Sequence, residues 1–116
     1  MENDENGYIV FITSDQLGTG EKELGGMLMK AFLNTLWEAE SRPDKIILMN
    51  NGVKLGVDGA DALETLALLE REGVNILSCG TCLAYYRLTQ KLKVGGVSNM
   101  REIVNVMLAA PKIIKI

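Results

Sequence analysis

Short apolar runs alternate along this chain with longer segments whose apolar residues recur at helical spacing. Four runs rich in β-branched residues predict buried strands, at 8–13, 45–50, 74–78 and 112–116. A fifth run, KVGGVS at 93–98, is interpreted as a loop or a short additional strand. The segments between the runs predict helices, which begin at Leu24 and then cover 62–73, roughly 81–92 and 100–110.

Helix-end signals accompany several of these segments. Asp61 with Glu64, and Asn99 with Glu102, have the spacing of capping boxes, and Gly73 can close the second helix in a left-handed conformation. The first helix carries an apolar stripe that we expect to face the core. Its members are Leu24, Met27, Leu28, Ala31, Phe32, Thr35 and Leu36.

Alternation of apolar strands with helices is typical of a parallel sheet covered on both faces. We therefore expect an α/β protein, a three-layer α/β/α sandwich with a mostly parallel sheet of about five strands. One domain is expected over 8–116, after a disordered lead-in at 1–7. Ligands of such sheets bind at the carboxyl ends of the strands, which here lead into 14–20, 50–59 and 78–82.

Composition narrows the possible functions. The net charge is -3, Lys and Arg are spread along the chain, and aromatic residues make up 5% of it, which argues against nucleic acid as a partner. No apolar run is long enough for a membrane span, and the N-terminus is acidic, unlike a secretory signal. We expect a cytoplasmic location with no membrane partner.

Histidine is absent from the sequence, which excludes histidine-based catalysis and histidine metal ligands.

The chain has two cysteines, Cys79 and Cys82, placed as Cys-x-x-Cys at a predicted strand-to-helix turn. Helix N-termini and Cys-x-x-Cys motifs both favour the thiolate, which is the nucleophilic form of cysteine. Cys79 is thus a candidate to attack a sulfane sulfur or a disulfide, and Cys82 is close enough to resolve the product. Gly80 would let backbone come close, and Thr81 offers a hydroxyl.

Residues of the neighbouring loops form a supporting set. Asn50, Asn51 and Gly52 are most simply a turn, and a second interpretation has them present backbone amides to the Cys79 thiolate. Asp15 is interpreted as a cap on the approach to the first helix rather than as a base.

The cysteine pair also allows three different roles. Free cysteines are often small buried hydrophobes. Zinc would need four ligands, so a metal site would require two copies of the chain to pool their pairs. A thioredoxin-like role fits the spacing but not the context, because Pro43 and Pro111 lie beside helix ends and the pair follows the third strand. No cofactor is expected.

Four stretches resemble the DsrE-like domain of YedF-type proteins, which are described as sulfurtransferase-like selenium metabolism proteins. They are FITSDQLGTGEKELGGMLMKAFLNTL, IILMNNGVKL, LLEREGVNILSCGTCLAYY and KVGGVSNMREIV, and the similarity runs over about 8–116. The resemblance implies a DsrE/DsrF-type fold, homo-oligomers, and a persulfide on a cysteine after the third strand. Cys79 matches that position, whereas Cys82 is an addition in the YedF-like group.

Full-length YedF proteins also carry an N-terminal TusA-like domain with a Cys-Pro motif, which is absent here. The chain is therefore expected to be either a stand-alone version or a fragment. The resulting hypothesis is a sulfur or selenium carrier, with a TusA-like carrier or a cysteine desulfurase as partner. A thiol–disulfide redox module and a non-enzymatic interaction subunit are the alternatives.

Overall fold

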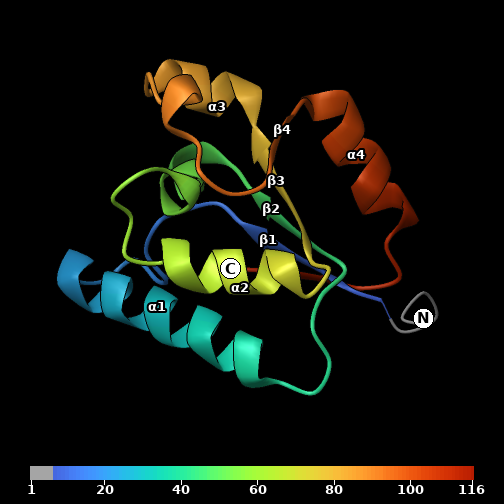
Figure 1. The fold of residues 1–116 in the computed structure, drawn as a ribbon, viewed down its shortest axis with the longest axis horizontal. Helices are drawn as coiled ribbons and strands as arrows, with labels where there is room; N and C mark the ends of the chain where they lie inside the picture. The colour runs from blue at the N-terminus through green and yellow to red at the C-terminus, as the bar shows by residue number, and fades with distance from the viewer. Residues whose placement is uncertain (1–6) are drawn as a thin grey trace.

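The computed structural model describes residues 7–116 (Figure 1), so the lead-in predicted at 1–7 lies outside the described residues except for Gly7. The strands are β1 (Ile9–Ile12), β2 (Lys45–Leu48), β3 (Asn75–Cys79), β4 (Gly96–Ser98) and β5 (Ile113–Lys115). The α-helices are α1 (Lys22–Glu38), α2 (Leu63–Arg71), α3 (Gly80–Tyr85) and α4 (Met100–Ala109). Two 3-10 helices, η1 (Asn50–Gly56) and η2 (Thr89–Lys91), complete the described elements.

The strands form one five-stranded sheet in the order β4-β3-β2-β1-β5, and every pairing in it is parallel. The predicted α/β class is confirmed. The run at 93–98, interpreted from the sequence as a loop or a short strand, contains the strand β4. In the register between β2 and β3, Leu48 lies opposite Ser78. β3 continues for one residue, Cys79, beyond this pair, so the two strands end at nearly the same level and the segments that follow them start side by side.

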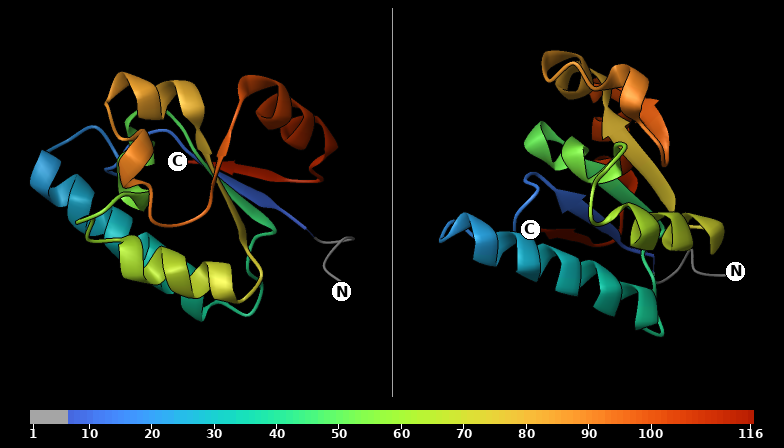
Figure 2. Two further views of the ribbon diagram at one scale, coloured as in Figure 1. Left: turned by 45° about the horizontal axis from the view of Figure 1, so that its top comes forward. Right: turned by 60° about the vertical axis from the view of Figure 1, so that its left-hand side comes forward.

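Strand order explains how the helices divide between the faces of the sheet. The chain moves in one direction from β1 to β4 and then returns to β5 at the other edge. Because such crossovers are right-handed, α1 and α2 cover one face and α4 covers the other. Figures 1 and 2 show this arrangement, with α3 beyond the carboxyl end of β3. The strands between these layers contribute completely buried apolar side chains to the core, among them Val10, Ile12, Ile46 and Ile76.

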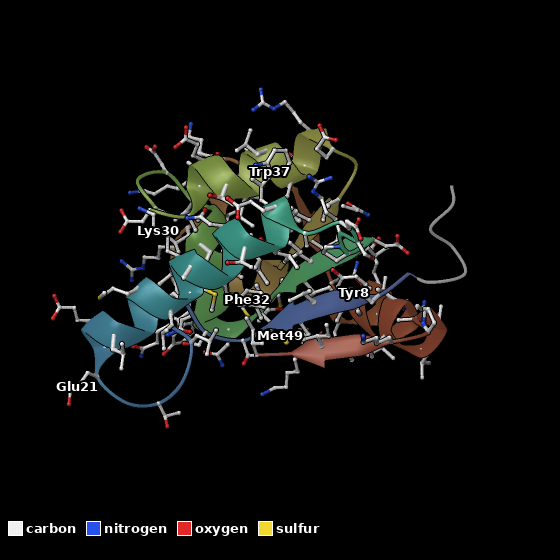
Figure 3. The ribbon with its side chains drawn as sticks, turned by 90° about the horizontal axis from the view of Figure 1, so that it is seen from below. Tyr8, Glu21, Lys30, Phe32, Trp37 and Met49 are labelled. Atoms are coloured by element: carbon white, nitrogen blue, oxygen red, sulfur yellow. The ribbon has the colours of Figure 1, made fainter. Side chains whose placement is uncertain are left out.

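The predicted apolar stripe of α1 is wrong in part. Leu24, Met27 and Leu28 are exposed, and the buried positions are Gly25, Met29 and Leu33. The buried face is rotated because glycine occupies its first position. A Cβ atom on Gly25 would lie 2.6 Å from Cβ of Gln16, so a larger residue would collide with the loop that precedes the helix. Phe32 and Trp37, labelled in Figure 3, pack against the core at the far half of the helix.

The helix-end predictions have mixed outcomes. The Asn99 cap is confirmed, since its Oδ1 accepts a hydrogen bond of 2.9 Å from the backbone N–H of Glu102. Gly73 ends α2 with a φ of 102°, as predicted. The Asp61 cap is wrong, because α2 starts after Ala62 without a side-chain cap. The predicted helix at 81–92 is also too long: α3 ends at Tyr85, and Arg87 has a φ of 60°.

Within residues 7–116, no helix combines the length and the apolar character that crossing a membrane requires.

Gly52 in η1 is expected to be essential for packing η1 against β1. A Cβ atom at this position would lie 2.6 Å from the carbonyl oxygen of Ile12, a backbone atom that cannot move aside. We expect Gly52→Ala to lower the free energy of unfolding by about 2 kcal/mol, as overpacking does elsewhere. Urea unfolding measures this change.

The matched control is Gly26→Ala. Gly26 is an exposed position inside α1, and nothing lies within 4 Å of a Cβ atom there. The better helix propensity of alanine should stabilise this variant by up to about 1 kcal/mol. Equal unfolding free energies for the two variants would contradict the packing argument at Gly52.

Candidate functional site

The two cysteines lie at the carboxyl end of β3. Cys79 is the last residue of the strand and immediately precedes α3, and Cys82 lies in the first turn of that helix. Both are free thiols. Cys79 is only 4% exposed, whereas Cys82 is half-buried. The two side chains are close enough for Cys79 to raise the pKa of the Cys82 thiol, so the predicted strand-to-helix turn places the two sulfurs near each other.

Gly80 allows β4 to pack closely against the cysteine turn. A Cβ atom on Gly80 would lie 3.1 Å from the carbonyl oxygen of Ser98 and 3.1 Å from Cγ1 of Val97. The register of the sheet also pairs Cys79 with Ser98. The expected close approach of backbone at Gly80 is therefore found, and its partner is β4. Thr81 is exposed at the start of α3.

A backbone amide from η1 points at the thiol pair. The N–H of Asn50 donates a 3.1 Å hydrogen bond to Sγ of Cys82. The prediction of an amide donor from this loop is right, but the predicted recipient, Cys79, is wrong. Asn50 has a φ of 56°, a left-handed conformation that asparagine tolerates better than most residues.

Further hydrogen bonds join this amide to the loop after β1. The backbone N–H of Asn51 donates to Oδ1 of Asn50 over 2.8 Å, and the N–H of Asp15 donates to Oδ1 of Asn51 over 3.3 Å. Gly52 closes the turn by donating its N–H to the carbonyl of Met49. These four predicted residues do lie together. Asp15 is not a helix cap, however, because α1 begins after Glu21 with no side-chain cap.

The surroundings of Cys82 favour its protonated form. Burial raises the pKa of the Cys82 thiol above its ordinary value, and the hydrogen bond and charge of Cys79 raise it further, while the Asn50 N–H opposes them. Cys82 therefore keeps its proton at neutral pH. A thiol proton beside a second sulfur is available as a hydrogen-bond donor to any negative charge that Cys79 carries.

Two tyrosines one helical turn beyond Cys82 were not predicted as site residues. Nζ of Lys54 lies 4.5 Å from the ring centre of Tyr86, which ties η1 to α3 by a cation–π contact. Tyr85 packs edge-on against Tyr86, and its own side chain is 80% exposed. The helix predicted at 81–92 already contains both tyrosines, but the contact between Lys54 and Tyr86 joins two distant segments and has no local signal in the sequence.

Two buried serines, Ser78 and Ser98, lie next to the cysteine turn. Oγ of Ser98 donates a 2.5 Å hydrogen bond to Oε1 of Glu102, and Ser98 is almost fully buried. Ser78, next to Cys79, is completely buried, and its Oγ has no hydrogen-bond partner among residues 7–116. Isolated serines in a strand carry no sequence signal of their own, so neither could have been predicted.

Across the part of the chain that the structure describes, no three His, Cys, Asp or Glu side chains gather in a way that could hold a metal ion. A metal shared by the cysteine pairs of two copies is only an alternative, and it stays untested.

Comparisons with known proteins identify the fold. No model of a protein family matches the sequence, and no curated protein matches it either. Among solved structures, the chain is similar to the YchN protein of E. coli, with a TM-score of 0.72 and 19% identity over 95% of this chain and 99% of YchN. A protein of unknown function from Methanobacterium thermoautotrophicum, MTH1491, has a TM-score of 0.66 and 19% identity over 95% of this chain and 99% of its own.

A third similar structure, the protein of unknown function BT1422 from Bacteroides thetaiotaomicron, has a TM-score of 0.65 and 17% identity over the full length of both chains. YchN and MTH1491 belong to the DsrE/F-like fold family. The chain is therefore an α/β protein with a DsrE/F-like fold, as the sequence predicted. At these identities the similarity establishes the fold alone.

Removing the neighbouring sulfur should lower the pKa of Cys82. Cys79→Ala deletes both the hydrogen bond and the charge that raise it, so a larger fraction of Cys82 is thiolate at any pH below the pKa. We expect Cys82 to react faster with iodoacetamide in this variant, with the pH profile of alkylation shifted to lower pH. Peptide mass spectrometry follows Cys82 alone.

Cys79→Ser is the matched comparison, because serine keeps a hydrogen-bonding group but cannot carry the negative charge. Its Cys82 profile should fall between those of the wild type and Cys79→Ala. Coincident profiles for all three proteins would show that Cys79 does not influence Cys82.

Proposed function

We propose that this chain is a carrier of sulfane sulfur, with Cys79 as the residue that holds it. The observation that supports this most directly is the proximity of two free thiols at the carboxyl edge of a parallel sheet, one of them buried and the other held by a backbone amide. Binding sites of open α/β sheets lie at this edge. The resemblance to YedF-type DsrE-like domains supports the same role for Cys79.

The chemistry is a transfer between thiols that needs no external oxidant. The Cys79 thiolate attacks the terminal sulfur of a donor persulfide, R–S–SH. A bond forms between Sγ of Cys79 and that sulfur, the donor S–S bond breaks, and the donor leaves as the thiolate R–S⁻. The product is Cys79–S–SH. An acceptor thiolate then attacks the terminal sulfur in the same way and regenerates the Cys79 thiolate.

Burial and the neighbouring thiol suit Cys79 for holding rather than releasing sulfur. Cys79 is only 4% exposed, so a persulfide there is shielded from stray thiols. Cys82 stays protonated and can donate a hydrogen bond to the persulfide. Its S–H is a poor nucleophile, which disfavours premature attack on the inner sulfur of Cys79–S–SH.

The remaining parts of the proposal come from the resemblance. We propose a YedF-type protein that works in the cytoplasm, receives sulfur from a cysteine desulfurase or a TusA-like carrier, and handles selenium by the same thiol chemistry. A homo-oligomer is part of the proposal. Large apolar side chains on opposite faces support it, since Met27 of α1 is 64% exposed and Leu108 of α4 is 80% exposed.

A thiol–disulfide module is the second candidate, and the proximity of the two sulfurs favours it. A Cys79–Cys82 disulfide would form by loss of two electrons and two protons to an oxidised substrate, and a thiol reductant would have to return them. This reaction needs the same pair of residues. The two functions differ in what the protein gains or loses in mass.

Intact mass measurement separates these possibilities. The protein is incubated with a cysteine desulfurase and cysteine and, in parallel, with inorganic polysulfide, so that loading does not depend on one donor. We expect the wild type to gain one sulfur atom that cyanide removes. Cys79→Ser should gain none, and Cys82→Ser should still be loaded.

Sulfur loading of Cys79→Ser would remove Cys79 from its proposed role. A loss of two hydrogens from the wild type, in place of a gain, would favour the redox module. An unchanged mass with both donors would contradict both functions and leave the interaction subunit.

A further inference from the structure

The segment around the thiol pair carries no acidic residue, although the protein is acidic overall. Residues 73–101 contain four basic residues, Arg87, Lys91, Lys93 and Arg101, and no acidic residue. The rest of the chain holds all 15 acidic residues and the other eight of the 12 basic ones. The cysteine turn, α3, η2 and β4 all belong to this basic segment. The basic residues are spread along the chain, as expected, but the acidic residues are missing from this segment, which leaves it with a net positive charge.

Hydrogen bonds bring this segment onto the same surface as η1. The N–H of Lys93 donates to the carbonyl of Gly56, and the N–H of Asp58 donates to the carbonyl of Lys91, both over 2.9 Å. Val57 and Leu92 form an antiparallel bridge between these hydrogen bonds. The chain after η2 thus runs beside the end of η1, the element whose first residue binds Cys82 (Figure 2).

Four basic side chains belong to this surface. Lys54 comes from η1 and reaches the ring of Tyr86, while Arg87, Lys91 and Lys93 are exposed on the segment after α3. Acidic residues border this surface as well: Asp58 lies at the junction, Glu70 accepts a hydrogen bond from the Gly95 N–H, and Asp15, Glu23 and Asp61 line a pocket with Lys54. The positive charge of the surface therefore comes mainly from Arg87, Lys91 and Lys93, which are exposed on the segment after α3.

Tyr85 adds an apolar contact to this surface. It follows Cys82 by three residues on α3, so it lies one helical turn away on the same side of the helix. Its ring is 80% exposed and is held edge-on against Tyr86. Protein interfaces place their strongest contacts at tyrosine, tryptophan and arginine, and an exposed tyrosine with a fixed ring is such a contact.

We propose that Lys54, Tyr85, Arg87, Lys91 and Lys93 form a docking surface for an acidic protein that presents a cysteine to the thiol pair. The inference rests on the proposed function in that the docked cysteine is the one that donates or accepts sulfur. Attraction between the basic surface and an acidic partner speeds encounter, and Tyr85 anchors the partner beside Cys82.

Three synthetic peptides serve as probes of this surface. Each has one cysteine, joined by a disulfide to thionitrobenzoate and flanked by glutamates, serines or lysines. A protein thiolate attacks the peptide sulfur, a new disulfide forms, and thionitrobenzoate leaves as a coloured thiolate. The leaving group is the same in all three, so rate differences report on the peptide charge. Uncharged dithiodipyridine measures the intrinsic reactivity of the thiols.

At low salt we expect the glutamate peptide to react about tenfold faster than the lysine peptide, a ratio that should approach one at about 1 M salt, where screening is nearly complete. The double variant Lys91→Glu and Lys93→Glu should reverse the order. The matched control is Lys112→Glu and Lys115→Glu, the same charge change at β5 on the far edge of the sheet, and it should keep the wild-type order. None of these variants should alter the rate with dithiodipyridine.

Tyr85→Ala separates protein docking from simple attraction of anions. It should slow the glutamate peptide severalfold and leave dithiodipyridine unchanged, whereas an unchanged peptide rate would exclude Tyr85 from the docking surface. Equal rates for acidic and basic peptides, or reversal by the β5 control, would overturn the proposal. Each of these results is independent of persulfide loading, so this inference and the proposed function can fail separately.

Discussion

The parallel register between β2 and β3 is the constraint on which the whole candidate site depends. Leu48 lies opposite Ser78, so both strands end at nearly the same level. Asn50 follows β2 by two residues and Cys79 directly follows Ser78, which places a backbone amide and a thiol pair in contact range. The left-handed conformation of Asn50 then directs its N–H to Cys82. A shift of register by one residue would separate these groups.

Glycines allow the surrounding elements to pack closely around the cysteine turn. Gly52 lets η1 lie against the carbonyl of Ile12, and Gly80 lets the cysteine turn lie against β4. The cysteine turn consequently lies between β4, which Gly80 approaches, and η1, whose Asn50 binds Cys82. This position explains why the two cysteines differ in exposure, and in the proposed function it separates a residue that holds sulfur from a residue that keeps its proton.

Much of this architecture could be predicted from the sequence because it follows from local patterns. Continuous apolar runs identify the strands of a parallel sheet, and the Cys-x-x-Cys motif falls between a strand and a helix.

The sequence-based prediction failed where tertiary contacts determine the local structure. The buried face of α1 depends on the contact between Gly25 and Gln16, and α3 ends early because Arg87 takes a left-handed conformation. Whether the Asn50 N–H binds Cys79 or Cys82 depends on the exact positions of the two sulfurs, and the spacing of residues in the sequence does not determine these positions. The net positive charge of residues 73–101 was present in the sequence all along, but its relation to the thiols appears only when η1 and the segment after η2 are seen side by side.

The proposed function requires that the two thiols act unequally, and localisation of the sulfur atom tests this most directly. The wild-type protein would be loaded with a persulfide donor, its persulfide capped by an alkylating reagent, and the peptide that contains both cysteines fragmented in a mass spectrometer. The account predicts that the additional sulfur lies on Cys79 and that Cys82 carries only the alkyl group. An additional sulfur on Cys82, or an equal distribution over both residues, would contradict it.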